Sequence, residues 1–211
     1  MSPITLKEKK LAIVLIDIIG STAFVQKHGA QKAAEWFQYH DRMTRNLCYK
    51  FNGREIDRSD GFLMSFERPI DAVNFALTYQ LNIPIKTRLG ARIGIHWGKV
   101  IEVTQDELYE AMGAKKIELE GLSKNIAART MSICEAQQVL ITKDAFDVIK
   151  NRTNAWTPKG TRYTNVGLYQ FKGVKEPIQI YAVGTTIESL QPPKGNEKVK
   201  RLGGPKRLNL K

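Results

Sequence analysis

The feature that most constrains the fold is an uninterrupted apolar run over residues 11–16 that ends at a carboxylate, Asp17. A strand with one exposed face alternates polar and apolar residues, so an unbroken run predicts a strand buried on both faces. Asp17 then leaves the core and is followed by Gly20, Ser21 and Thr22, where a helix is expected to begin. Free amides at a helix start favour anions, and Ser21 or Thr22 could cap this helix.

A second carboxylate, Asp60, lies in the turn Ser59–Asp60–Gly61, between segments 54–58 and 62–66 that predict a hairpin. Two acids on neighbouring strands could hold two metal ions, because hard cations prefer oxygen ligands on a stiff backbone. Taken singly, Asp17 is equally well explained as a helix cap and Asp60 as a turn residue. Only their combination with later motifs favours a metal site.

The remaining pattern alternates helices and strands. We expect helices over 31–51, from Pro69 onward and over 121–136, an alternating strand over 88–96 that turns at Gly98 into 99–103, and late strands over 139–142 and 178–183. This order predicts an α+β fold, a ferredoxin-like split βαβ sandwich with a mostly antiparallel sheet and helices on one face.

Length and charge predict one domain over residues 1–184 and a basic flexible C-terminal tail over 185–211. The net charge is +12, and residues 189–211 supply half of it, with seven basic residues, one acidic residue and no aromatics. Such a tail can touch RNA, membrane phosphates or an acidic partner, or simply stay solvated. No apolar stretch approaches the ~20 residues that span a bilayer, and no secretory signal is recognisable, so we expect no membrane insertion and a cytoplasmic location.

Asn125 and Arg129 lie four residues apart in the predicted helix 121–136 and therefore share one face. The planar guanidinium of arginine suits a phosphorus centre that gains charge during displacement. An exposed polar helix face is the simpler interpretation of such a pair taken alone.

Over residues 9–184 the chain resembles the class III nucleotidyl cyclases, that is, the adenylate and guanylate cyclase homology domain. The resemblance rests on five stretches in the right order and spacing: 15–22, 59–62, 92–98, 125–129 and 171–177. It implies a metal-dependent lyase that makes a cyclic nucleotide from a nucleoside triphosphate and releases pyrophosphate.

The resemblance also implies roles for individual residues. Asp17 and Asp60, with the backbone carbonyl of Ile18, would hold two Mg²⁺ or Mn²⁺ ions per active site. Asn125 would orient the ribose and Arg129 would stabilise the transition state. The remaining substrate contacts are expected from the turn at Gly20, Ser21 and Thr22 and from Lys172, which would hold the terminal phosphates. In the family the metal site and the Asn–Arg pair come from different protomers, which implies a head-to-tail homodimer with composite sites and an inactive monomer.

The base-reading positions depart from the family pattern. Purine cyclases place a lysine or glutamate where this chain has Ile56 or, with a one-residue deletion, Asp57, and their second base contact falls on Glu118. An apolar residue leaves polar groups of a purine unpaired, at about 1–3 kcal/mol each. Arg58 and Trp97 are interpreted as extra bulky residues near the site, and a smaller pocket favours pyrimidines.

These departures make the chain similar to the pyrimidine cyclases of bacterial Pycsar antiphage systems. That similarity implies conversion of UTP to cyclic UMP, a second messenger in antiviral defence that acts on a separate cyclic-nucleotide-responsive effector. The alternatives are a cytidylate cyclase that makes cyclic CMP from CTP and an adenylate cyclase with an unusual base pocket.

Two further classes of protein fit the sequence less well. A catalytically dead nucleotide-binding homologue is disfavoured because Asp17, Asp60, Asn125 and Arg129 are all present. An RNA-binding module would share the sheet topology but lacks the stacking aromatics on a central strand, so no specific nucleic-acid partner is expected. The histidines have no zinc-site spacing and both cysteines are expected to be reduced thiols.

Overall fold

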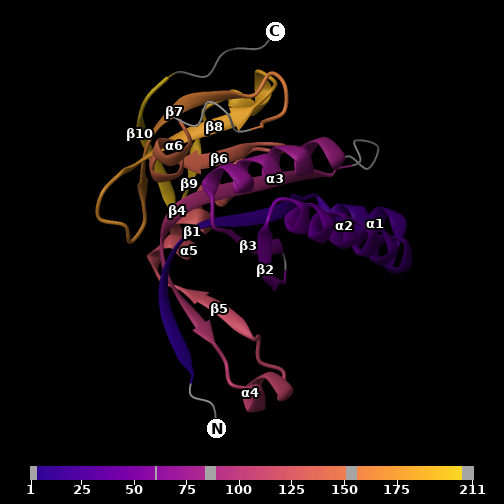
Figure 1. The fold of residues 1–211 in the computed structure, drawn as a ribbon. Coiled ribbons are helices and arrows are strands. Elements are labelled where there is room, and N and C mark those ends of the chain that lie inside the picture. The colour runs from indigo at the N-terminus through magenta and orange to yellow at the C-terminus, as the bar shows by residue number, and fades with distance from the viewer. Residues whose placement is uncertain (1–3, 60, 84–88, 151–155, 206–211) are drawn as a thin grey trace.

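The computed structural model describes residues 4–59, 61–83, 89–150 and 156–205. Over these residues the strands form a ten-stranded sheet in the order β2-β3-β1-β4-β6-β8-β7-β10-β9, with β5 paired to β4 (Figure 1). The strands are β1 (Thr5–Ile19), β2 (Gly53–Arg58), β3 (Gly61–Phe66), β4 (Gly90–Thr104), β5 (Ile117–Glu120), β6 (Val139–Thr142), β7 (Arg162–Phe171), β8 (Ile178–Gly184), β9 (Gly195–Asn196) and β10 (Val199–Gly203). The helices are α1 (Ser21–His28), α2 (Ala30–Lys50), α3 (Pro69–Asn82), α4 (Glu107–Ala111), α5 (Leu122–Ser132), α6 (Lys143–Ile149) and the short 3-10 helix η2 (Glu188–Leu190).

The sheet is antiparallel at its described pairings except between β4 and β6, which run parallel. Residues 11–16 of β1 are largely buried on both faces, since successive side chains point to opposite sides of the sheet and both sides are covered. Ala12 and Val14 pack with residues of α2, α3 and α6, whereas Leu11 and Ile13 pack with Ala127 of α5. The predicted α+β architecture is therefore confirmed, with most helices on one face and α5 against the other.

Several elements lie where the hydrophobic periodicity predicts them. Helix α2, the β2–β3 hairpin and strand β6 match their expected ranges, and α3 begins with Pro69 at its first helical position. Proline suits that position because its missing N–H would have no helical partner and its φ angle is preset. Arg88, the expected start of the strand before Gly98, lies outside the described residues.

The expected turn at Gly98 is wrong. β4 continues without a break from Gly90 to Thr104, and Gly98 pairs with Leu11 of β1 inside it. A Cβ atom at Gly98 would lie 2.3 Å from Oγ of Ser123, which donates a hydrogen bond to the backbone oxygen of Lys99 at 2.7 Å. This glycine therefore makes room for the start of α5 rather than for a change of chain direction.

The expected flexible tail also does not hold for residues 195–203. Strand β10 pairs with β7, and Val199 is only 1% exposed within an apolar cluster that includes Tyr169 and Phe171. The hydroxyl group of Tyr169 donates to the backbone oxygen of Pro193 at 2.8 Å, which fixes the approach to this strand. The segment extends the sheet instead of leaving it.

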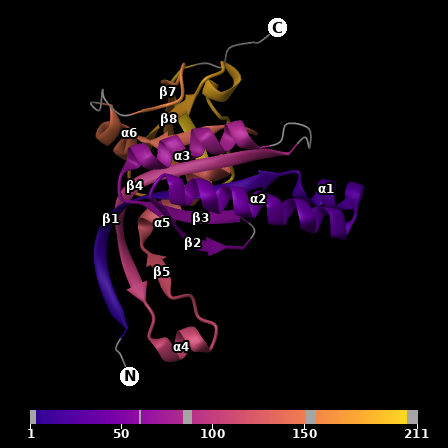
Figure 2. The same cartoon turned by 45° about the vertical axis from the view of Figure 1, so that its right-hand side comes forward.

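The outer halves of β1 and β4 project from the body as an arm, with β5 along it and α4 at its tip (Figures 1 and 2). Large apolar side chains on this arm are exposed, among them Leu6 (67%) and Met112 (73%). Over the described residues, none of the helices is both long and apolar enough to cross a membrane.

Candidate active site

Asp17 lies near the end of β1, between two strands that fix its position. In the sheet it is opposite Gly61 of β3 on one side and opposite Arg92 of β4 on the other. A Cβ atom at Gly61 would lie 2.1 Å from the backbone oxygen of Ile16, so glycine alone allows this close approach. The carboxylate is thus held by stiff backbone, and Ile18, the expected carbonyl ligand, is the next residue of the same strand.

Arg92 forms an ion pair with Asp17. Its Nε donates to Oδ2 of Asp17 at 3.0 Å, and its Nη2 contacts the same oxygen. The two side chains are 31% and 25% exposed, and a pair this open to water contributes only about 1 kcal/mol or less. Arg92 therefore neutralises the charge of Asp17, and a divalent cation can replace it. Sequence reasoning missed it, although strand alternation sets Arg92, Gly94 and His96 on one face.

A hollow of about 260 Å³ opens beside Asp17. It is walled by the ends of β1, β2 and β3 and by α5, through Leu15, Ile16, Asp17, Asp57, Ser59, Gly61, Phe62, Leu63, Lys124 and Met131. Two carboxylates and one ammonium group thus share one small space. A roomier hollow of about 400 Å³ beside β7 is lined by no acidic residue, so it cannot supply a carboxylate to a metal ion.

The chemistry of this hollow fits a divalent cation. Asp17 and Asp57 line it, as do Ser59 and Gly61, the chain neighbours of Asp60, which itself lies outside the described residues. Within the described ranges there is no cluster of three or more His, Cys, Asp or Glu that could hold a metal. Mg²⁺ and Mn²⁺ do not need one, since Mg²⁺ typically takes one or two protein carboxylates and completes its shell with water and substrate phosphates.

Asn125 and Arg129 lie on α5 but not in this hollow. Asn125 is exposed and Arg129 half-buried, whereas Lys124 and Met131 of the same helix do line the hollow. At about 100° per residue, the two sets point in clearly different directions around the helix. The predicted pair therefore shares a face, as expected, but within one chain it does not meet Asp17.

Packing against the sheet fixes the rotation of α5. A Cβ atom at Gly94 of β4 would lie 2.2 Å from the backbone nitrogen of Met131 and 2.6 Å from the oxygen of Ala127. The helix backbone thus rests directly on the strand, with Ile126, Ala127 and Thr130 buried. This contact leaves the Asn125 side of the helix free.

The two residues expected to contact the base, Ile56 and Asp57, lie in different surroundings. Ile56 is only 9% exposed and packs with Leu11 and Val100, at a register shift in β2 between Glu55 and Asp57. Asp57 instead lines the hollow and forms an ion pair with Lys115 from the loop that precedes β5. Of the two alternatives that the sequence left open, the structure brings Asp57 to the hollow.

Of the two bulky residues that the sequence placed near the site, Trp97 lies elsewhere, whereas Arg58 lies behind the wall of the hollow without lining it. The side chain of Trp97 packs with the apolar cluster under α2 and α3, and Lys10 Nζ lies 5.6 Å from its ring centroid. Since alternate residues of β4 face opposite sides, Trp97 is turned away from Arg92, and its expected role near the site is wrong. Arg58 points toward α2, where its Nε donates to Asp41 at 3.0 Å.

The remaining residues predicted to contact the substrate lie on three different elements outside the lining of the hollow. Gly20 is the N-cap of α1 with φ of 86°, and no side-chain cap bond forms, so neither Ser21 nor Thr22 caps the helix. Glu118 of β5 accepts a long hydrogen bond from Gln105 at 3.4 Å. Lys172 is exposed in the turn after β7, and its backbone N–H donates to Lys198 at 2.9 Å.

The two cysteines are not candidates for nucleophilic chemistry. Cys48 and Cys134 are both buried and free, and burial raises the pKa of each thiol to about 12. Thiolate is therefore scarce near neutral pH. This agrees with the expectation of reduced thiols.

Comparisons with known proteins identify the family and the fold. The model of the adenylate and guanylate cyclase catalytic domain matches residues 5–185, so the chain belongs to this family. It is 23% identical over 198 residues to the serine/threonine-protein kinase pkn2 of Myxococcus xanthus, covering 90% of this chain and 21% of that protein. It is 26% identical over 168 residues to the receptor-type adenylate cyclase GRESAG 4.1 of Trypanosoma brucei brucei, covering 80% and 12%.

A solved structure shows the same fold. The adenylyl cyclase CyaB from P. aeruginosa superposes with a TM-score of 0.73 at 20% identity, covering 85% of this chain and 95% of that one. The chain spans only 12–21% of the length of the curated relatives it matches. It therefore corresponds to one domain of those longer proteins.

Proposed function

We propose that this chain is a nucleotidyl cyclase that acts as a head-to-tail homodimer with two composite active sites. The observation that carries the proposal is the separation of Asp17 from Asn125 and Arg129 within one chain. Neither α5 residue lines the hollow beside Asp17, yet both are free to face outward. A second copy that presents its α5 to the hollow would bring the acidic groups and the guanidinium together.

The reaction is an intramolecular displacement at phosphorus. The 3′-hydroxyl oxygen of the ribose forms a bond to the α-phosphorus, the bond from that phosphorus to the bridging oxygen breaks, and pyrophosphate leaves while the hydroxyl proton passes to solvent. When bound by Asp17, Asp60 and the carbonyl of Ile18, Mg²⁺ or Mn²⁺ would supply charge that acidifies the hydroxyl and holds the triphosphate.

The chain's own residues supply orientation and charge. Asn125 holds the ribose so that its hydroxyl is aligned with the α-phosphate, which removes much of the entropic barrier. Arg129 offers several donors to the crowded phosphorus, where negative charge builds up in the transition state. Lys172, with the amides at Gly20, Ser21 and Thr22, contacts the phosphate groups. Arg92 keeps Asp17 paired until substrate arrives.

For the base we propose a pyrimidine, with UTP first and CTP second. Ile56 is buried in the core, so it offers no polar contact to a purine edge. Asp57 lines the hollow and is paired with Lys115, so the two side chains present an acceptor and a donor side by side. ATP in an unusual pocket is the alternative. The cyclic nucleotide would then act in antiviral defence as a cytoplasmic second messenger for a separate effector.

The direct test is to incubate the purified protein with ATP, GTP, CTP and UTP in separate reactions with Mn²⁺ or Mg²⁺ and to identify products by mass. We expect cyclic UMP and pyrophosphate in equal amounts. Predominant cyclic AMP would refute the pyrimidine assignment but leave the cyclase proposal intact. Absence of any cyclic product from all four substrates, with folded dimer present, would refute the cyclase proposal itself.

A further inference from the structure

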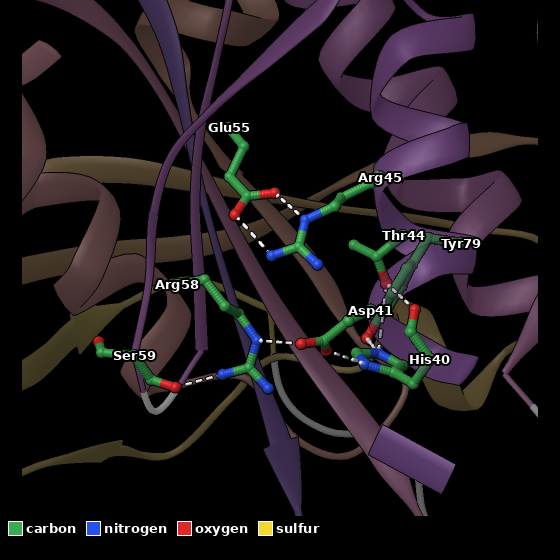
Figure 3. A network of polar contacts seen from close by, with 8 residues as sticks. All are labelled: His40, Asp41, Thr44, Arg45, Glu55, Arg58, Ser59 and Tyr79. Atoms are coloured by element: carbon green, nitrogen blue, oxygen red, sulfur yellow. Dashed lines mark hydrogen bonds and ion pairs between the residues drawn. The ribbon is translucent and has the colours of Figure 1, made fainter. Parts of the chain in front are cut away.

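A buried chain of hydrogen bonds runs from α3 through α2 to the turn at the end of β2 (Figure 3). His40 is 1% exposed, Asp41 7% and Tyr79 0%. The Tyr79 hydroxyl lies 2.7 Å from Nε2 of His40, and Nδ1 of His40 lies 3.1 Å from Oδ1 of Asp41. Arg58 Nε donates to the other carboxylate oxygen, Oδ2, at 3.0 Å.

The chemistry of the groups assigns the donor and the acceptor of each hydrogen bond in this network. A carboxylate only accepts, so His40 must donate from Nδ1 to Asp41. Burial lowers the pKa of His40, which keeps the imidazole neutral and leaves Nε2 to accept from Tyr79. Thr44 donates to the backbone oxygen of His40 at 2.8 Å. Both oxygens of Asp41 are thereby engaged, and its carboxylate is held in one orientation.

Arg58 connects this fixed carboxylate to the wall of the hollow. Its Nη1 donates to the backbone oxygen of Ser59, and its guanidinium carbon lies 4.8 Å from the ring centroid of Phe62 (Figure 3). Ser59 and Phe62 both line the hollow beside Asp17. The N–H of Ser59 also donates to the oxygen of Gly61 at 3.2 Å. Arg58 therefore binds the backbone oxygen of Ser59, while the N–H of the same residue is held by Gly61.

We propose that Arg58 is a positioning residue that sets the Ser59 side of the hollow, rather than a residue that contacts the base. The inference rests on the proposed function, because the turn matters for turnover only if the hollow holds the metal and the triphosphate. The bridge needs two separate donor groups in one plane, which arginine has and lysine lacks. Lysine at this position can keep the charge pairing with Asp41, but its single nitrogen cannot reproduce the two separate donor positions that reach Asp41 and Ser59.

The chain offers a matched control. Arg45 of α2 binds Glu55 of β2 through two hydrogen bonds of 2.6 and 2.9 Å, and its guanidinium carbon lies 5.7 Å from the same Phe62 ring. Like Arg58, Arg45 therefore joins α2 to β2 beside Phe62. In the described part of the chain, however, no hydrogen bond or ion pair links Arg45 to Ser59. Comparing Arg58→Lys with Arg45→Lys separates the effect of the contact with Ser59 from the effect of the ion pairs that join α2 and β2.

The experiment measures two quantities for both lysine variants of the full chain. The first is kcat and KM with whichever nucleotide the wild type converts, and the second is amide hydrogen exchange in peptides that cover residues 57–63. For Arg58→Lys we expect kcat to fall about ten- to a hundredfold with KM changed less, and faster exchange confined to that segment. For Arg45→Lys we expect less than a twofold change in kcat and unchanged exchange there.

The outcomes are distinguishable. Unchanged exchange and kcat in Arg58→Lys would overturn the positioning role while the proposed function stands. A wild type without turnover would refute the proposed function, and faster exchange in Arg58→Lys alone would still support the effect of the contact with Ser59. Arg58→Ala is a poorer test because it leaves the buried Asp41 carboxylate without its cation and strongly destabilises the fold. Equal effects of both lysine variants would show a merely structural role and also overturn the proposal.

Discussion

Arg92 of β4 and Asp17 of β1 are directly opposite each other in the sheet, and the guanidinium occupies one oxygen of the carboxylate expected to bind metal. A cation that binds Asp17 therefore competes with Arg92 for the negative charge of this carboxylate. Because both groups are partly open to water, the pair opposes metal binding by only about 1 kcal/mol.

This competition predicts the behaviour of Arg92→Gln. Without the guanidinium, Asp17 is free, so we expect Mn²⁺ to bind the nucleotide-free protein about fivefold more tightly. The measurement is the rise in melting temperature on titration with Mn²⁺, compared with Arg54→Gln, which removes an arginine of β2 that pairs with Glu102. Equal rises in both variants and the wild type would show that Arg92 does not compete for the site.

The composite site predicts complementation between two inactive variants. Asp17→Ala removes the acidic half and Arg129→Ala the guanidinium half, so each homodimer should lose turnover. In a heterodimer one site carries both changes and the other carries neither. After exchange of subunits, half of the dimers are mixed, and we expect about a quarter of wild-type activity. Failure of mixed dimers, isolated by two affinity tags, to turn over substrate would argue against sites shared between chains.

The contact between α5 and β4 predicts a strong effect of Gly94→Ala. The added methyl group would meet the backbone of Met131 and Ala127, so the helix must move. We expect a loss of about 1–3 kcal/mol in the free energy of unfolding and a larger loss of turnover than stability alone explains. Gly203→Ala is the control, since a Cβ atom there has no neighbour within 4 Å. Urea unfolding and kcat together check the prediction.

His96 predicts a loss of stability in acid. Burial lowers the pKa of His96 to about 4, although the nearby Asp144 carboxylate acts in the opposite direction. The unfolded chain takes up this proton near pH 6.5 and the folded chain only near pH 4, so stability is complete above pH 6.5 and falls as the pH drops toward 4. The slope should reach about 1.4 kcal/mol per pH unit. In His96→Gln the slope should be shallower, and an unchanged slope would contradict the assignment. His28→Gln, at an exposed position, is the control.

Much of the fold follows from local patterns, but the sheet register does not. The apolar run before Asp17 predicted a doubly buried strand because its pattern admits no exposed face. What stands opposite Asp17 depends on pairing with β4, more than 70 residues later, and that pairing revealed Arg92. Ion pairs between distant strands leave no periodic signal in a single sequence. The placement of Trp97 was wrong for the same reason, since only register and packing decide its face.

The predicted turn at Gly98 and the predicted flexible tail were wrong for a related reason, because both depend on contacts between distant segments. Gly98 resembles a turn in sequence, but its small size serves the close approach of Ser123 from a distant helix. Basic residues around Val199 suggested a solvated tail, whereas burial of Val199, pairing with β7 and the Tyr169–Pro193 hydrogen bond hold the segment in the sheet. Conversely, Asn125 and Arg129 were placed on one helix face by spacing alone, because that geometry is entirely local.

The arm has a mechanical consequence. β1 and β4 each run for 15 residues with no interruption, from its tip to the level of Asp17 and Arg92. Their backbones are paired residue by residue along that length, so the tip of the arm and the Asp17–Arg92 ion pair lie on the same two strands. A partner bound at the exposed tip would therefore be connected to the Asp17 carboxylate by continuous backbone pairing, without any chain of side chains in between.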